Sequence, residues 1–290
     1  MPTYRTSALL KGAMAGVLFG TAAIFIRLLS NMDSLSIALG RLVIASSAIA
    51  VMLLVAKPRV QAKTLRELSH FIVTLGILIG MHFLLFASAV KDTSILNATV
   101  LVNTTPIFAM IFSCVILRTR PSVVSVLGAS MAFTGMLALS FSETSLGLVG
   151  NLRGDIEATA AAVLEGLYLN IGKGVRSRIP ALVAMLPIYI TAAALVIGAT
   201  SVAGRSFAIP IESSVLFSLM GLGLLPTALG HTLYFSSLSD LKSFQTATLA
   251  MIEPIMASLL GLLVFGEMPS VQYVFGAAMI LLGIFLVISK

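Results

Sequence analysis

The chain has 290 residues, of which 58% are hydrophobic and 10% are charged, and its mean hydropathy is +1.08. About a quarter of the residues in soluble domains are charged, so this composition excludes a soluble globular protein and predicts a protein embedded in a membrane. The net charge of +7 lies in short segments between hydrophobic runs. That pattern is typical of membrane topology, and we therefore predict no nucleic-acid partner.

Ten hydrophobic segments follow one another along the chain, each long enough to cross about 30 Å of hydrocarbon as a helix that rises ~1.5 Å per residue. Lipid offers no hydrogen-bond partners to open backbone groups, so we predict an all-α polytopic membrane protein with ten transmembrane helices. The first segment ends at Arg27 without a small-residue cleavage site, and we interpret it as a retained span. The predicted spans cover residues 8–28, 35–56, 69–90, 95–117, 121–141, 156–173, 181–203, 214–237, 243–265 and 270–288.

Basic residues are distributed unevenly between the two sides that ten spans define. With the N-terminus in the cytoplasm, thirteen of the eighteen Lys and Arg residues fall on the cytoplasmic side, four fall outside, and Arg41 lies within the second span. Cytoplasmic loops of membrane proteins collect Lys and Arg. We therefore predict a protein of the inner or plasma membrane with both termini in the cytoplasm.

The second half of the chain repeats the first at an offset of 148 residues, where eleven of the 35 positions from 106 to 140 are identical. Each unit holds five spans, and because five is odd, the second unit enters the membrane from the opposite side. We predict two inverted five-helix repeats, residues 1–148 and 149–290. The aligned pairs include Pro106/Pro254, Pro121/Pro269, Gly128/Gly276, Gly135/Gly283 and, after slight gaps, His82/His231 and Gly20/Gly166.

Short motifs accompany the repeat: Leu39-Gly40-Arg41-Leu42 in the second span, Glu253-Pro254 and Gly266-Glu267 in the ninth, and Gly276-Ala277 with Gly283 in the tenth. In these motifs the chain resembles the EamA family of the drug/metabolite transporter superfamily. The resemblance implies two five-span repeats, cytoplasmic termini and transport of small organic molecules. Two features depart from the family: the first repeat has Thr119 where the second has Glu267, and the lack of tryptophan weakens any stacking on an aromatic substrate.

Two histidines occupy equivalent positions in the third and eighth spans. A repeat axis brings equivalent residues together near the middle of the membrane, where the substrate sites of such transporters form. Tyr234 and Thr227 share one helical face with His231, behind Pro226. We interpret His82, His231 and Tyr234 as substrate-binding residues. The alternative is a pair of packing histidines, each bonded to a neighbouring carbonyl group.

Ionisable groups at bilayer depth cost about 2.5–3.5 kcal/mol on insertion scales, so each needs a reason. Arg41 could bind a substrate carboxylate, or it could pair with helix-terminal carbonyl groups or an acid, or extend toward the membrane surface. Glu253 could carry a coupling proton, or it could be a structural acid beside the kink that Pro254 permits. We predict that Pro254 and its repeat equivalent Pro106 act as hinges.

The remaining candidate binding residues come from helical spacing. Glu165 and Tyr168 share a face of the sixth span, and Asn97 and Thr104 lie seven residues apart on one face of the fourth. These faces could line a substrate cavity. Equally, they could join neighbouring helices through hydrogen bonds worth ~0.6 kcal/mol each.

The sequence contains no G-x-x-x-x-G-K-[ST] loop for ATP, so a gradient must supply the energy of transport. The leading hypothesis is a secondary transporter that exports small metabolites such as amino acids by alternating access. A sugar-phosphate or nucleotide-sugar exchanger is the alternative within transport, although Arg41 alone is a weak basis for phosphate binding. A membrane-embedded enzyme is a further alternative, but H-E-x-x-H and G-x-S-x-G are both missing, and we predict no enzyme activity, metal or cofactor. The expected partners are a small solute and membrane lipid.

Overall fold

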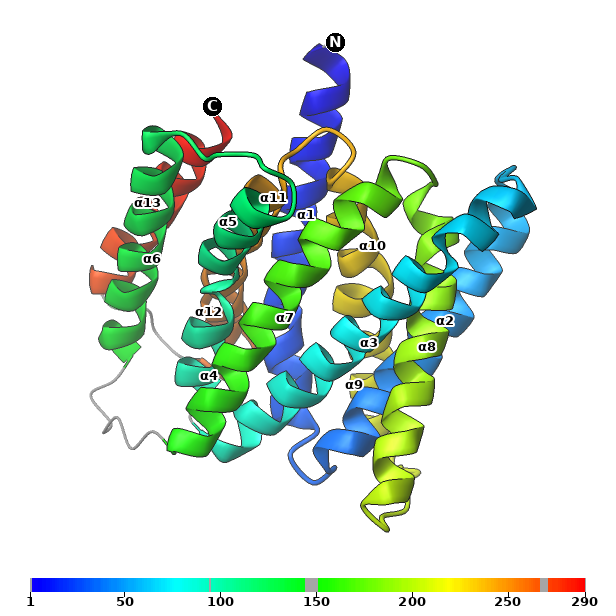
Figure 1. Cartoon of the computed structure of the whole chain (residues 1–290). Coiled ribbons are helices and arrows are strands. Elements are labelled where there is room, and N and C mark those ends of the chain that lie inside the picture. The colour runs from blue at the N-terminus through cyan, green and yellow to red at the C-terminus, as the bar shows by residue number, and fades with distance from the viewer. Residues whose placement is uncertain (1, 94, 144–150, 267–270, 290) are drawn as a thin grey trace.

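The computed structural model describes residues 2–93, 95–143, 151–266 and 271–289, and the regular structure in these ranges is entirely helical. Short connections join the helices into a bundle (Figure 1). The elements in chain order are α1 (Pro2–Leu28), α2 (Ser34–Ala56), α3 (Ala62–Asp92), α4 (Ile95–Val102), α5 (Thr105–Val115), α6 (Val123–Glu143), α7 (Leu152–Arg176), α8 (Ala181–Val202), α9 (Ser213–Leu222), η1 (Gly223–His231), α10 (Thr232–Ser237), α11 (Ser243–Ala250), α12 (Glu253–Phe265) and α13 (Val271–Ile288).

These elements build ten membrane spans, which confirms the predicted fold class. Among the described residues, seven helical stretches are long and apolar enough to cross a membrane, and α6 and α13 contribute two shorter apolar stretches. The remaining span, α7, carries charged residues near its ends, among them Arg153 and Arg176. Three spans are divided among consecutive elements: α4–α5, α9–η1–α10 and α11–α12.

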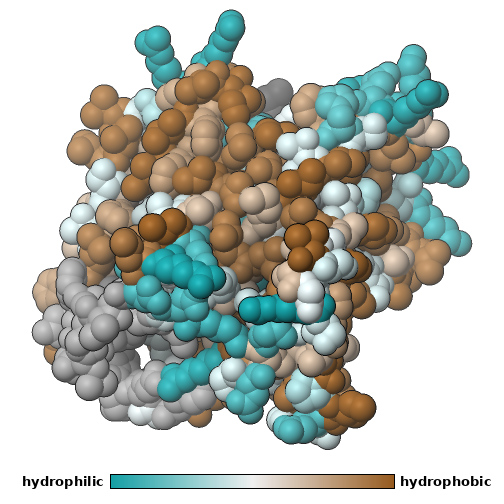
Figure 2. Space-filling view, turned by 60° about the horizontal axis from the view of Figure 1, so that its bottom comes forward, coloured by the Kyte–Doolittle hydropathy of each residue, from teal (hydrophilic) through white to brown (hydrophobic). Residues whose placement is uncertain are grey.

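The outer surface is more hydrophobic than the surface of a protein that is surrounded by water. Leu54, Phe217 and Leu263 are 73%, 72% and 79% exposed, and many other large apolar side chains accompany them. Figure 2 shows hydrophobic residues over the flank of the molecule and hydrophilic residues gathered toward its ends. Apolar surface on this scale is stable against lipid tails, so the protein is integral to a membrane. Both termini lie at the same end of the bundle (Figure 1), as an even number of spans requires.

Glycines let the last helices of the two repeats pack closely. A Cβ atom at Gly128 of α6 would lie 2.8 Å from the carbonyl oxygen of Gly283 in α13, and one at Gly135 would lie 2.7 Å from that of Gly276. The earlier glycine of each helix therefore meets the later glycine of the other, so α6 and α13 run antiparallel. Such close approach of backbones is how helices associate in lipid.

The first helix of each repeat packs against the opposite repeat in the same way. A Cβ atom at Gly20 of α1 would lie 2.5 Å from Cβ of Met256 in α12. One at Gly166 of α7 would lie 2.9 Å from Cβ of Phe108 in α5, and Gly166 and Phe108 are the repeat equivalents of Gly20 and Met256. The first, fourth, sixth and ninth spans thus interleave at the centre of the bundle, where α5 also contacts α11.

The fourth and ninth spans break where the repeated prolines occur. α5 begins at Thr105 with Pro106 in its first turn, and α12 begins at Glu253 with Pro254 in its first turn. Proline has no N–H to donate to the preceding turn, but the first turn of a helix tolerates it. Each proline therefore starts a new helix inside its span. The predicted hinge role of Pro106 and Pro254 remains a prediction.

Candidate functional site

A narrow cavity lies at the level of the two helix breaks, and residues of both repeats line it. The space open to the centres of water molecules is about 40 Å³, which is enough for a few waters and too little for an amino acid. Phe19, Phe83 and Phe86 form part of the wall. The polar and ionisable wall residues are Arg41, His82, Asn103, Thr105, Glu165, His231, Tyr234 and Glu253.

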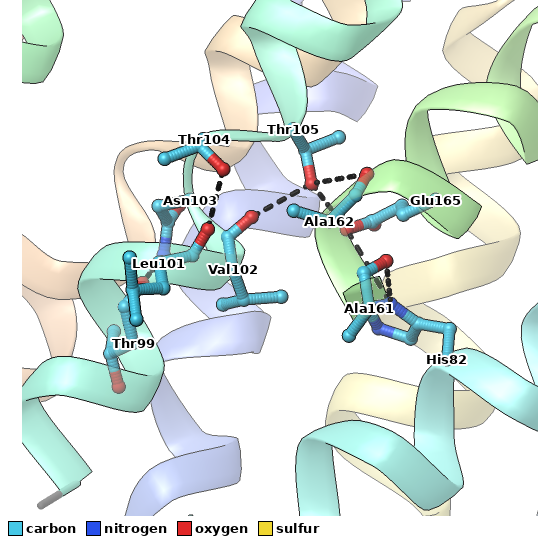
Figure 3. Close-up of polar contacts among 10 residues, drawn as sticks. All are labelled: His82, Thr99, Leu101, Val102, Asn103, Thr104, Thr105, Ala161, Ala162 and Glu165. Carbon is cyan, nitrogen blue, oxygen red and sulfur yellow. Dashed lines mark hydrogen bonds and ion pairs between the residues drawn. The ribbon is translucent and has the colours of Figure 1, made fainter. Parts of the chain in front are cut away.

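Six of the nine predicted binding residues meet in this cavity. Tyr168 does not line it: its hydroxyl donates to Sδ of Met185 at 3.6 Å inside the packed core. The Thr104 hydroxyl donates to the carbonyl oxygen of Leu101 in its own span at 2.6 Å (Figure 3). Asn97 belongs to α4, and its side chain lies outside the described residues. The six that meet are Arg41, His82, Glu165, His231, Tyr234 and Glu253.

The two histidines lie close together but differ in their bonding. Their ring centroids are 6.4 Å apart. Nδ1 of His82 lies 3.0 Å from the carbonyl oxygen of Ala161, so the neutral ring carries its proton on Nδ1. The ring of His231 lies 4.6 Å from that of Phe19 and 4.9 Å from that of Phe83, and its buried Nδ1 has no hydrogen-bond partner in the described chain. Only His82 therefore matches the alternative of a packing histidine bonded to a carbonyl group.

Glu165 of α7 reaches the break in the fourth span (Figure 3). The hydroxyl of Thr105 donates to Oε2 of Glu165 at 3.0 Å. The same hydroxyl lies 2.8 Å from the carbonyl oxygen of Val102, which Pro106 leaves without its helical N–H donor. Oε2 of Glu165 is also 4.0 Å from Nδ1 of His82. The carboxylate is thus held between α3 and the start of α5.

Glu253 opens α12 at the equivalent break in the ninth span. The side chain of Asn103 donates a hydrogen bond to the Glu253 carboxylate, and its Nδ2 also donates to the carbonyl oxygen of Thr99 at 2.9 Å. Glu253 lies close enough to Glu165 and Arg41 to interact with both electrostatically. Two carboxylates and one guanidinium group therefore share a single small cavity.

Asn103 and Thr105 belong to the wall although helical spacing did not single them out. Spacing along a continuous fourth span selects Asn97 and Thr104, but the break between α4 and α5 redirects the side chains that follow it. The repeat does carry a signal for Thr105, because this residue aligns with Glu253 at the offset of 148. No comparable signal marks Asn103.

The wall of the cavity follows the repeat. In two of the four pairs of equivalent wall residues, the second repeat supplies a carboxylate and the first supplies an uncharged side chain. Equivalent positions therefore surround the cavity, while both of its acids come from the second repeat. The four aligned pairs are Phe19 with Glu165, His82 with His231, Val102 with Ala250, and Thr105 with Glu253.

Arg41 is buried and anchored to the eighth span. Its Nε donates to the hydroxyl oxygen of Thr227 at 2.9 Å, and its guanidinium group lies 3.9 Å from the ring centroid of Phe83. Thr227 lies in η1, a π-helical segment that contains Pro226. The Thr227 hydroxyl donates to the carbonyl oxygen of Leu222 at 2.6 Å. In an α-helix this carbonyl group would accept from the backbone N–H of residue 226, but Pro226 has no N–H. Arg41 therefore helps to fix the π-helical segment that ends at the cavity wall.

Thr227→Val is expected to lower the free energy of unfolding by about 1–3 kcal/mol, because it leaves the buried Nε–H of Arg41 without a partner. Arg41→Met removes the guanidinium group, so Thr227→Val should cost less in an Arg41→Met background. Denaturant unfolding of the purified single and double variants in detergent measures both costs.

Thr200→Val provides the matched control for this cycle. The buried Thr200 hydroxyl donates to the carbonyl oxygen of Val196, which already accepts the helical N–H, so its loss should change stability little. An equal cost of Thr227→Val with and without Arg41 would contradict the assigned role of the hydroxyl.

Comparison with known proteins matches one family model to the chain twice. The model of the EamA-like transporter family covers residues 6–141 and again residues 152–289. Two proteins of Archaeoglobus fulgidus, each described as an uncharacterized transporter, are similar to the chain. One is 25% identical over 201 residues (67% of both chains), and the other is 26% identical over 278 residues (93% of this chain and 92% of the relative). The uncharacterized transporter YwfM of Bacillus subtilis is 29% identical over 210 residues, which are 71% of this chain and 68% of YwfM.

A solved crystal structure shares the fold, with a TM-score of 0.81 at 20% sequence identity over 97% of this chain and 96% of that one. The family model, which fits each half of the chain, agrees with the five-span repeat read from the sequence. The resemblance carried by the Leu39–Leu42 and Glu253-Pro254 motifs is thereby confirmed. The chain belongs to the EamA-like transporter family.

Proposed function

We propose that the protein is a secondary transporter that exports small organic solutes such as amino acids across the inner or plasma membrane. The central cavity carries this proposal: it lies at the breaks of the fourth and ninth spans, and both repeats contribute ionisable groups to it. Such groups are costly at membrane depth and mark substrate or ion pathways. We propose no chemical step on the solute, which should therefore be recovered unchanged.

Two features favour alternating access by inverted repeats. The equivalent helices α6 and α13 pack antiparallel, as opposite orientations of the two repeats would require. The cavity is too small for an amino acid, so the surrounding helices must separate before a solute enters. Separation on one side at a time, with Pro106 and Pro254 as hinges, would expose the same cavity alternately to each side of the membrane.

A sugar-phosphate or nucleotide-sugar exchanger is less well supported. Phosphate binding calls for several buried Lys or Arg donors, but Arg41 is the one Lys or Arg among the described wall residues, and its Nε is bonded to Thr227. Two carboxylates in the same cavity would also repel a phosphate group. The charges of the cavity therefore favour solutes without phosphate.

Flux measurements in liposomes test the proposed function. Purified protein is reconstituted, and the movement of radiolabelled amino acids and amines is followed with and without a proton gradient. We expect saturable, protein-dependent movement of at least one chemically unchanged solute, which protein-free liposomes do not show. Movement of none of these solutes under either condition would overturn the proposal.

The proposed orientation is tested by labelling single cysteines in a Cys114→Ala background. Asn31→Cys lies in a connection predicted to face outward, and Arg59→Cys lies in a basic connection predicted to be cytoplasmic; both positions are exposed. An impermeant thiol reagent should label position 31 in intact cells and position 59 only after the membrane is permeabilised. The opposite pattern would show that the termini face outward.

A further inference from the structure

The central cavity carries more negative than positive formal charge. With its histidines neutral, Glu165 and Glu253 contribute two negative charges against the single positive charge of Arg41. Hydrocarbon and packed protein screen this excess poorly, so a counter-charge inside the cavity would be strongly stabilising. The described wall residues provide no second cation of their own. A solute with a positive charge therefore complements the cavity.

Several hydrogen-bond donors of the wall are committed to the protein. The side-chain amide of Asn103 donates to the carbonyl oxygen of Thr99 and to the carboxylate of Glu253. The Thr105 hydroxyl donates to Glu165, and Nε of Arg41 donates within the eighth span's π-helical segment. These donors hold the acids and the backbone in place.

Several of the groups left open can act as acceptors. Because Nδ1 of His82 holds its proton against a carbonyl group, Nε2 of the neutral ring is an acceptor. Nδ1 of His231 and the hydroxyl of Tyr234 are buried without a partner in the described chain, although both residues line the cavity. Together with the carboxylates, these atoms can accept the hydrogen bonds that the several N–H groups of one bound ammonium donate.

Aromatic rings complete the wall around these acceptors. Phe19, Phe86 and Tyr234 line the same cavity. A cation beside an aromatic ring is attracted to the face of the ring, and more strongly the further the cation is desolvated. The protein itself provides an example in this cavity, since the guanidinium group of Arg41 lies 3.9 Å from the ring centroid of Phe83.

We propose that the cavity recognises its solute by a protonated amine, which binds between Glu165 and Glu253, and that a carboxylate on the solute is dispensable. The proposal rests on the proposed function, because it concerns the same cavity, and it narrows the solutes to organic amines, amino acids among them. The amine needs at least one N–H, since its partners are hydrogen-bond acceptors. Arg41 is the one Lys or Arg of the described wall that could meet a solute carboxylate; its Nε is bonded to Thr227 and its guanidinium group lies against Phe83.

Three probes with one branched carbon skeleton test this inference: 3-methylbutylamine, leucine and 4-methylpentanoate, which carry net charges of +1, 0 and −1 near neutral pH. Their affinities for the full-length protein in lipid nanodiscs are measured by calorimetric titration at constant ionic strength. We expect the amine to bind most tightly, leucine next and 4-methylpentanoate at least about tenfold more weakly than the amine, as loss of a charge-assisted hydrogen bond predicts.

Glu165→Gln and Glu253→Gln should each weaken amine binding by about tenfold or more, whereas the control Glu212→Gln, exposed before α9, should leave it unchanged. The comparison among probes uses the unaltered protein, so it holds even if a variant folds poorly.

Three results would each overturn the inference. They are binding of 4-methylpentanoate as tight as that of the amine, no amine binding at all, and unchanged amine affinity in both cavity variants. If the amine binds but no solute moves in liposomes, the transport proposal fails and the inference stands. If leucine moves but the amine does not bind, the inference of amine recognition fails and the transport proposal stands.

Discussion

Glu253→Gln is expected to lower solute flux per folded molecule by about ten- to a hundredfold while changing the free energy of unfolding little. Glutamine has nearly the same shape as glutamate and keeps an acceptor for the side chain of Asn103, which bonds to Glu253 in the native protein. It removes one of the two carboxylates of the cavity, and a hydrogen bond to a charged group contributes about 1.5–3 kcal/mol. Initial rates in liposomes, normalised to folded protein, provide the measurement.

The competing interpretation of Glu253 predicts a different pattern. If this residue is only a structural acid at the break of the ninth span, the glutamine variant should transport at the native rate and unfold more easily. If Glu253 instead carries the coupling proton, the variant should also lose the dependence of flux on a proton gradient. Glu212→Gln serves as the control for removing a carboxylate elsewhere. Native flux in Glu253→Gln, with native dependence on the gradient, would contradict a role for this acid in transport.

The ten spans could be predicted from the sequence because lipid forces every backbone group of a span into a helix. The ends of the helices were harder to predict from the sequence. The third span was predicted over 69–90, whereas α3 is Ala62–Asp92, since a helix can continue into water where hydropathy no longer marks it. The π-helical segment η1 was not predicted either. Pro226 indicates a loosened turn, but its geometry depends on the Thr227 hydroxyl and on Arg41 from another span.

The residues of the cavity wall were predictable where the repeat marks them and less so where helical spacing does. The alignment pairs His82 with His231, and both residues line the cavity; their role in binding remains a prediction. Spacing placed Tyr168 beside Glu165 on one face of α7, but the Tyr168 side chain turns toward Met185 in α8. The boundary between residues 148 and 149 lies outside the described residues and remains a prediction. Residues aligned by the repeat occupy equivalent positions in the two halves of the fold. Helical spacing, in contrast, predicts a shared face only where the helix is unbroken.

Gly283→Val is expected to have the largest effect on folding. A Cβ atom at Gly283 would lie 2.5 Å from the backbone nitrogen of Ala132 and 2.5 Å from the carbonyl oxygen of Gly128, and backbone cannot move aside as a flexible side chain can. Overpacking costs typically ~1–3 kcal/mol, and this contact belongs at the upper end of that range or beyond it. The yield of monodisperse protein and its thermal unfolding in detergent measure the effect.

Gly198→Val in α8 is the matched control, because a Cβ atom there meets no heavy atom within 4 Å. It should change stability by no more than about 0.5 kcal/mol beyond the intrinsic helix preferences of the two residues. The repeat adds an internal test: a Cβ atom at Gly135, the equivalent of Gly283, would lie 2.7 Å from the carbonyl oxygen of Gly276, so Gly135→Val should be damaging too. If Gly283→Val and Gly135→Val behave like Gly198→Val, then α6 and α13 do not depend on close backbone contact. The antiparallel pairing that supports inverted repeats would then lose its physical basis.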